Sequence, residues 1–103
     1  MHKYGLHGSL TARPGEGQQL AAILLEASRL VSTAKGCHLY LVSQSPDDAE
    51  TVWVTEVRDS KSDHDNSLQV PGVGELIARA MPILAGQPQK GQELAVLGGA
   101  GIG

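Results

Sequence analysis

The sequence predicts an α+β domain in which four antiparallel strands form one sheet and two helices cover one of its faces. Three observations lead to this prediction. Short segments alternate apolar and polar residues with the period of two that is typical of strands. Two longer stretches repeat their apolar residues at helical spacing. These segments follow one another in the order strand, helix, strand, strand, helix, strand.

Composition limits what the chain can be. Its 103 residues are the size of one domain, which we expect to span residues 1–103, and 41% apolar with 18% charged residues is typical of a folded chain. The net charge of -3, with eight scattered Lys and Arg residues, excludes the basic surface of a nucleic-acid-binding protein. The single cysteine, Cys37, excludes an internal disulfide. Without a signal-peptide pattern or an apolar run of roughly 20 residues, we expect a soluble, cytoplasmic protein that does not enter a membrane.

The first strand and the first helix are expected at the start of the chain. Over Tyr4–Ala12, the leucines and the tyrosine share one parity, while His7 and small residues share the other. Over about Glu16–Thr33, apolar residues at helical spacing form one stripe. Lys35 and Gly36 predict the end of this helix, because a cation is favourable there and glycine accepts the left-handed conformation that often follows.

The middle of the chain predicts a hairpin. The segments Cys37–Ser43 and Thr51–Arg58 are rich in β-branched and aromatic residues, and residues 45–48 have turn chemistry. On the second of these strands, two valines share one face with Glu56. The pattern therefore places a carboxylate at the end of an apolar row.

Two helical segments follow the hairpin. Ser60 with Asp63 three residues later matches a capping box, which predicts a short helix that continues to Leu68. A second helix is expected from Pro71, with an apolar stripe at helical spacing. Pro82 near its end is expected to break or kink it.

The chain is expected to close with a loop over 86–91, a last strand over 92–97 and a flexible tail over 98–103. The complete order is the split βαβ arrangement of ferredoxin-like folds, βαββαβ. Because both helices lie on one face, the other face of the sheet is bare and partly apolar. We therefore expect two copies to associate through that face as a dimeric α/β barrel.

The order and spacing of five short segments resemble the antibiotic biosynthesis monooxygenase domain family. Gly36–Val42 is similar to its Gly-Cys-x-x-Tyr-x-Val signature, and Trp53–Ser60 is similar to its Glu-x-Trp-x-Ser strand end. Asp63–Leu68 resembles the histidine segment that follows. Tyr4–Gly8 and Gly98–Gly99 match the branch of quinol monooxygenases.

This resemblance implies a homodimer with one pocket per subunit, between the sheet and the helices. It also implies oxygenation of a quinol or polycyclic aromatic by molecular oxygen, without flavin, haem or metal. The sequence departs from the family at Arg58, because the family usually has tryptophan at this position. This departure weakens the assignment of the protein to the haem-degrading branch of the family.

Two residues are the catalytic candidates. His64 is expected to accept a phenolic proton, because an imidazole exchanges protons near neutral pH. The alternative is a solvated histidine between Asp63 and Asp65. Glu56 is expected to orient His64 or to accept a substrate hydroxyl, and its alternative role is an ion pair with an arginine such as Arg58.

Polar and aromatic residues elsewhere are candidates for binding the substrate. For the tyrosine among them the alternative is a place in the core, and for the tryptophan a place in the dimer interface. These candidates are His7, His38, Tyr40, Trp53, Asn66 and Arg79. No pair of histidines stands at metal-ligand spacing on a predicted helix, so no metal is expected.

Three functions stay open from the residues. The first is cofactor-independent monooxygenation of a quinol or related aromatic. The alternative is a non-catalytic small-ligand-binding or stress-response module on the same dimeric barrel. Isomerase or decarboxylase chemistry is the third, since His64 and Glu56 would suit it equally well. It stays open because fold alone does not fix function.

Overall fold

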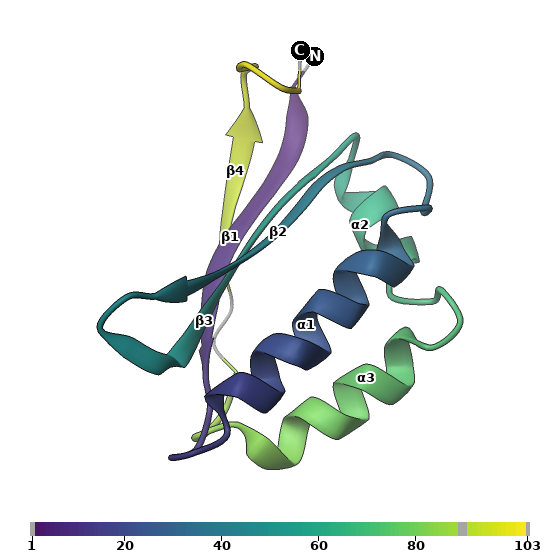
Figure 1. The fold of residues 1–103 in the computed structure, drawn as a ribbon. Helices are drawn as coiled ribbons and strands as arrows, with labels where there is room; N and C mark the ends of the chain where they lie inside the picture. Colours follow the sequence, from purple (N-terminus) through teal and green to yellow (C-terminus); the bar gives the residue numbers. More distant parts are fainter. Residues whose placement is uncertain (1, 89–90, 103) are drawn as a thin grey trace.

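A computed structural model describes residues 2–88 and 91–102 and confirms the α+β order (Figure 1). The expected loop over 86–91 includes residues 89–90, and the expected domain includes residues 1 and 103, all outside the described part. The elements are β1 Lys3–Thr11, α1 Gly17–Val31, β2 Cys37–Ser45, β3 Asp48–Arg58, α2 Lys61–Ser67, α3 Val73–Ala80, the 3-10 turn η1 Met81–Ile83 and β4 Gln92–Val96.

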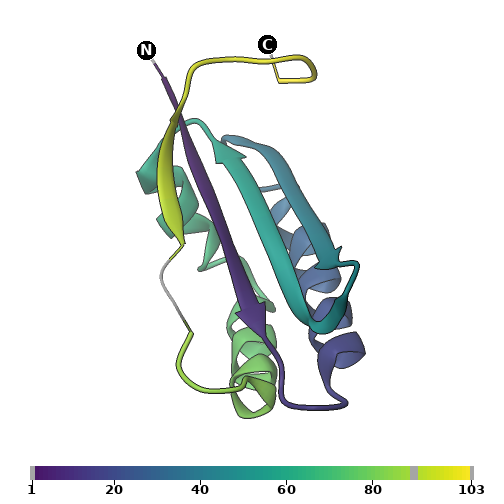
Figure 2. The same cartoon turned by 90° about the vertical axis from the view of Figure 1, so that its left-hand side faces the viewer.

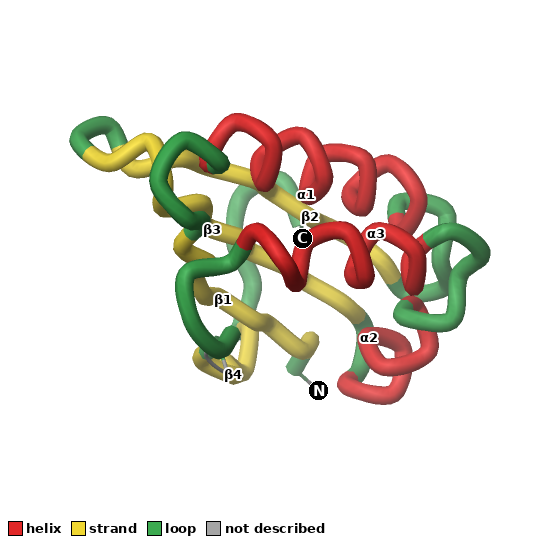
Figure 3. Tube along the Cα trace, turned by 90° about the horizontal axis from the view of Figure 1, so that it is seen from below, coloured by secondary structure: helices red, strands yellow, loops and turns green. Residues whose placement is uncertain are grey.

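The four described strands form one antiparallel sheet in the order β2-β3-β1-β4. All helices lie on one side of it (Figure 1), and the view turned by 90° looks onto the uncovered side (Figure 2). Seen from below, α1 and α3 run next to each other along the sheet (Figure 3). The architecture is therefore the expected ferredoxin-like sheet with one covered and one open face. None of the described helices is long and apolar enough to cross a membrane.

Strand register decides which side chains face the helices. Glu56 of β3 lies opposite Leu6 of β1 and Tyr40 of β2, and directly opposed residues project from the same face. An irregularity between Cys37 and Leu39 shifts the parity of β2 at its first residues. For that reason His38 does not simply share the face of Tyr40, as strict alternation would predict.

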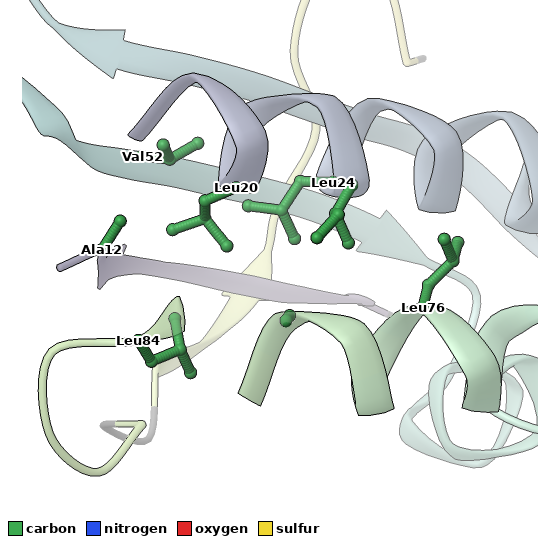
Figure 4. Packing of buried hydrophobic residues seen from close by; sticks show 8 residues of the cluster. Ala12, Leu20, Leu24, Val52, Leu76 and Leu84 are labelled. Atoms are coloured by element: carbon green, nitrogen blue, oxygen red, sulfur yellow. The ribbon is translucent and has the colours of Figure 1, made fainter. Parts of the chain in front are cut away.

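The core fills the layer between the sheet and the two longer helices. Leu20 and Val52 are fully buried, and aliphatic side chains from β1, α1, β3 and α3 pack around them (Figure 4). The cluster consists of Ala12, Leu20, Ile23, Leu24, Val52, Leu76, Ala80 and Leu84. Apart from Ala12 and Val52, which come from the strand segments, its residues belong to the stripes whose periodicity predicted the two helices.

Glycine and proline set the limits of the last helix. Gly72 has φ +96°, which a residue with a Cβ rarely adopts, so the segment at Pro71 is a turn and α3 begins only at Val73. The α-helix ends at Ala80, and Pro82 lies in the 3-10 turn that follows. The expected break at Pro82 is confirmed, whereas the expected start at Pro71 is two residues early.

Candidate functional site

A cavity of about 220 Å³ lies between the sheet and all three helices. Aliphatic residues of α1 and α3, with Leu10 of β1, form most of its wall. The polar side chains that line it are few and come from β2, β3 and α2: Tyr40, Glu56, Arg58, His64 and Ser67. An apolar hollow with a few convergent polar groups is typical of a small-molecule site.

Glu56 and Arg58 form a buried ion pair at one end of this cavity. They are two residues apart on β3, so both side chains project toward the helices. Only 7% of Glu56 and 1% of Arg58 is exposed. The Arg58 Nη2 donates to Glu56 Oε1 at 2.7 Å. The sequence left two roles open for Glu56, an ion pair with an arginine or the orientation of His64. The structure shows the pair with Arg58, and it also places Glu56 beside His64.

His64 is held close to this pair by α2. Its Nε2 lies 3.8 Å from Glu56 Oε2, which is longer than a hydrogen bond. The Ser60 hydroxyl accepts from the Asp63 backbone N–H and so fixes the start of the helix. The ring of His64 lies 5.6 Å from that of Tyr4, and its Nδ1 is 3.1 Å from Asp65 Oδ1. Only 16% of the His64 side chain is exposed, so the ring is largely buried rather than freely solvated.

The two tyrosines near the site are kept protonated. Burial raises the pKa of Tyr40, the charge of Glu56 adds to this effect and that of Arg58 opposes it. Burial, together with a 2.8 Å hydrogen bond from the Tyr4 hydroxyl to Glu93, raises the pKa of Tyr4 to about 12. Both hydroxyls therefore carry their protons at neutral pH.

A second hollow of about 170 Å³ adjoins the cavity. Its lining includes Gly8 of β1 and Gly91, the residue before β4. The two hollows have Leu10, Leu24, Tyr40 and Glu56 in common. Glu56 and Tyr40 therefore stand where the two spaces meet.

Two of the predicted binding residues lie on the open face of the sheet. The rings of His7 and Trp53 stack with centroids 5.2 Å apart. His7 Nδ1 is 2.9 Å from the Thr55 hydroxyl, and the Trp53 indole N–H donates to the Ser45 hydroxyl at 3.0 Å. Neither residue lines the cavity, because odd positions of β1 and β3 point away from the helices.

Three further predicted binding residues are exposed. His38 pairs with Asp59 at 2.6 Å, and this contact lowers the pKa of the Asp59 carboxyl. Asn66 projects from α2 into solvent. Arg79 lines a shallow outer hollow between α1 and α3. Of the eight predicted site residues, the structure brings three together at the cavity: Tyr40, Glu56 and His64.

Sequence reasoning missed Arg58 and Ser67 as lining residues. The signal for Arg58 was its position two residues after Glu56, on the same face of β3. For Ser67 the signal was weaker, since its hydroxyl donates to the His64 carbonyl within α2. Within residues 2–88 and 91–102, no three His, Cys, Asp or Glu side chains gather in a way that could hold a metal ion.

The fold and the cavity define a ferredoxin-like chain with a largely apolar hollow between its sheet and its helices. Residues 4–79 match the family model described as antibiotic biosynthesis monooxygenase. This match covers more than half of the chain, so the chain belongs to the antibiotic biosynthesis monooxygenase family. Among curated proteins, no significant match is found.

Solved structures share this architecture. A proposed antibiotic biosynthesis monooxygenase from Chloroflexus aurantiacus J-10-fl is 40% identical, with a TM-score of 0.86 over 98% of this chain and 99% of that one. Another from Nitrosomonas europaea is 14% identical, with a TM-score of 0.86 over 93% and 91% of the chains. Rv0793 from Mycobacterium tuberculosis is 21% identical, with a TM-score of 0.81 over 95% and 98%. The last two support the fold alone.

Proposed function

We propose that this protein is a cofactor-independent monooxygenase that oxidises a quinol or related aromatic with molecular oxygen. The observation that supports it best is the meeting of His64, Glu56 and Tyr40 at an apolar cavity. Family membership supports oxygenation as the class of reaction. His64 is the base, Glu56 orients its imidazolium, and Tyr40 donates to a substrate oxygen.

The reaction balances without a reductant. His64 Nε2 takes a proton from a quinol hydroxyl, and the resulting anion passes one electron to oxygen. The substrate radical and superoxide combine through a new C–O bond to a hydroperoxide. The terminal proton of this hydroperoxide is the one that His64 took and now returns. The C–H bond at the oxygenated carbon then breaks together with the O–O bond: its electron pair forms C=O, and its proton joins the departing hydroxide as water. A quinol plus oxygen thus gives a hydroxyquinone plus water. The apolar wall favours this course because it excludes water from the reactive anion.

The size of the cavity favours a small ring system. An apolar cavity of about 150 Å³ accommodates benzene. The main cavity of about 220 Å³ therefore accepts one aromatic ring with its hydroxyls. It lies below the roughly 300 Å³ that is typical of drug-sized ligands. Two fused rings would extend past Glu56 into the adjoining hollow, so a polycyclic substrate needs both spaces.

The proposal includes a homodimer through the open face of the sheet. On that face Leu41 of β2 is 49% exposed and Leu94 of β4 is 50% exposed. Together with the stacked Trp53 and His7, they make the face more apolar than the solvated side of an antiparallel sheet usually is. An apolar face that pairs with its own copy would be covered in both subunits. In this arrangement His7 and Trp53 belong to the interface and not to substrate binding.

Oxygen consumption tests the enzymatic proposal. Purified protein is mixed with a reduced benzoquinone and a reduced naphthoquinone, and oxygen uptake and hydroxylated product are followed together. We expect His64→Ala to lower the rate about 100-fold or more, as is usual for loss of a general base. Glu56→Gln is expected to lower it less, and His2→Ala, at an exposed position, is the matched control.

The outcomes separate the candidate functions. Uptake no faster than in buffer, or the same with His64→Ala as with the parent, refutes the oxygenase proposal. A binding module is the second candidate, favoured by the buried Arg58 in place of an aromatic residue. It predicts thermal stabilisation by the quinol without oxygen uptake, and a product formed under nitrogen indicates isomerase or decarboxylase chemistry.

A further inference from the structure

Arg58 carries more hydrogen-bond donors than its neighbours use. Its side chain is 1% exposed, and Nη2 donates to Glu56. Its Nε and Nη1 are also buried, and no acceptor for them exists among the described residues. A guanidinium keeps its charge and has five N–H donors, and buried donors of this kind are nearly always paired in proteins. Within residues 2–88 and 91–102, one of the three nitrogens thus has an acceptor.

Two of the other polar groups that line the cavity, those of Ser67 and Glu56, already have hydrogen-bond partners in the protein. The Ser67 hydroxyl donates to the His64 carbonyl at 2.6 Å, and Glu56 Oε1 accepts from Arg58. The rest of the lining is almost wholly aliphatic. In such surroundings a fixed cation attracts an anionic oxygen more strongly than it would in water.

We propose that the cavity binds its aromatic ligand as an oxyanion and that Arg58 is the residue that holds the charged oxygen. This inference rests on the proposed function and names its substrate class, an aromatic with an ionisable hydroxyl. An oxygen that enters beside Arg58 supplies an acceptor for one of the two nitrogens, Nε or Nη1, that have none among the described residues. The site selects against aromatic ethers and hydrocarbons, which cannot carry that charge.

The charges of the site balance both before and after the proton moves. Glu56 and Arg58 form a neutral pair, and the phenol enters neutral. When its O–H bond breaks and the proton binds Nε2 of His64, the imidazolium and Arg58 face the phenolate and Glu56. Two positive charges then stand beside two negative ones, and no electron has moved.

Other charged groups near the site act against the anion. Glu56 lies on the same strand as Arg58, Asp65 is beside His64 on α2, and Glu93 of β4 binds the Tyr4 hydroxyl. Lys61, whose Nζ lies 3.3 Å from Glu93 Oε2, is a cation that offsets the charge of Glu93. Ionisation of a bound phenol therefore depends on the charge of Arg58 more than on the charged groups at the protein surface.

The ionisation of a bound phenol can be measured directly with a coloured phenol. 4-Nitrophenol changes its absorbance when it ionises, so titrating it with and without excess protein gives the pKa of the bound probe. We expect the parent to lower that pKa by about 1 unit or more, the effect of a close opposite charge. Arg58→Gln is expected to remove the shift, whereas Arg29→Gln, an exposed arginine of α1, leaves it unchanged.

Two further measurements keep the test decisive if Arg58→Gln does not fold. Glu56→Gln removes the competing carboxylate and is expected to lower the pKa of the probe further. 4-Nitroanisole, which has no proton to lose, is expected to bind the parent more weakly than the phenol at high pH. An unshifted or raised pKa of the probe, no binding of the probe, or a shift that persists in Arg58→Gln, refutes the proposal.

The result is independent of oxygenation. A lowered pKa without oxygen uptake keeps the oxyanion site and refutes the monooxygenase. Oxygen uptake with an unshifted probe keeps the monooxygenase and refutes the role of Arg58.

Discussion

At the scale of single residues, Tyr4 and Tyr40 have contrasting surroundings, although the charge of Glu56 acts on both. Tyr40 is enclosed by the cavity, whereas Tyr4 lies at its edge against the ring of His64 and binds Glu93. Burial is the main reason that the pKa of each is raised. A raised phenol pKa means that folding favours the protonated form.

The pH dependence of Tyr4 follows with a definite sign. Its pKa rises from 10.0 to about 12, so its contribution to stability is complete below pH 10 and is lost as the pH rises through about 12. In Tyr40→Phe, where Tyr4 alone titrates, tyrosinate absorbance is expected to appear with a midpoint near the higher value. The same variant in denaturant should titrate near the lower one. Coinciding midpoints in the two states would contradict the hydrogen bond to Glu93.

Residue types predicted the centre of the site better than its edges. Glu56 stood out because a carboxylate ended an apolar row, and His64 because an imidazole can accept a phenolic proton and lies in a segment that resembles the family's histidine segment. Arg58 was noted as a departure from the family and as a possible partner of Glu56, but not as a lining residue, because an arginine at a strand end is usually solvated. Whether its guanidinium is buried depends on helices that are distant in sequence. His7 and Trp53 had the correct parity assigned, but parity alone does not tell which face holds a cavity.

At the scale of elements, α1 starts without a side-chain cap of its own. Glu16 makes no capping hydrogen bond, and instead the carboxylate of Glu50 on β3 accepts from the backbone N–H groups of Gly17 at 2.7 Å and Gly15 at 3.3 Å. A negative charge is favourable at the positive end of a helix dipole. Glu50 thus joins the helix to the sheet, a long-range contact that no local pattern announces.

Removal of this carboxylate should weaken the whole fold. Glu50→Ala is expected to lower the free energy of unfolding by about 1–2 kcal/mol, the usual cost of losing a helix cap. Glu50→Gln keeps an oxygen acceptor and is expected to lose less. Glu75→Ala, in the exposed first turn of α3, is a control for removal of an acidic residue. Urea unfolding measures all three, and equal stability of the parent and Glu50→Ala would contradict this role.

Gly17 itself could have been recognised only with the structure in hand. A Cβ at this position would lie 2.0 Å from the Ala49 carbonyl oxygen, a backbone atom that cannot turn aside. Helix propensity alone disfavours glycine here. The close packing of α1 on β3 overrides that propensity, which is why the helix was predicted but its attachment was not.

At the scale of the whole molecule, the open face of the sheet is the surface that the proposed dimer covers. Leu41→Lys and Leu94→Lys each place a charge on it at a half-exposed position, so the fold should persist. We expect the parent to sediment as two chains and both variants as one. Leu25→Lys, at a similarly exposed leucine on α1, should stay paired. A parent that sediments as a single chain, or an equal effect of Leu25→Lys, would contradict this interface.

The spacing of Glu56 and Arg58 has a consequence for how the pocket could admit a molecule. These two residues are joined by one length of backbone, whereas His64 is carried on the separate seven-residue helix α2. If α2 swings outward, the proton acceptor departs while the carboxylate and guanidinium stay beside each other. In such a motion, ligand entry and the return of the imidazole would be separate events, because Glu56 and Arg58 stay together on β3.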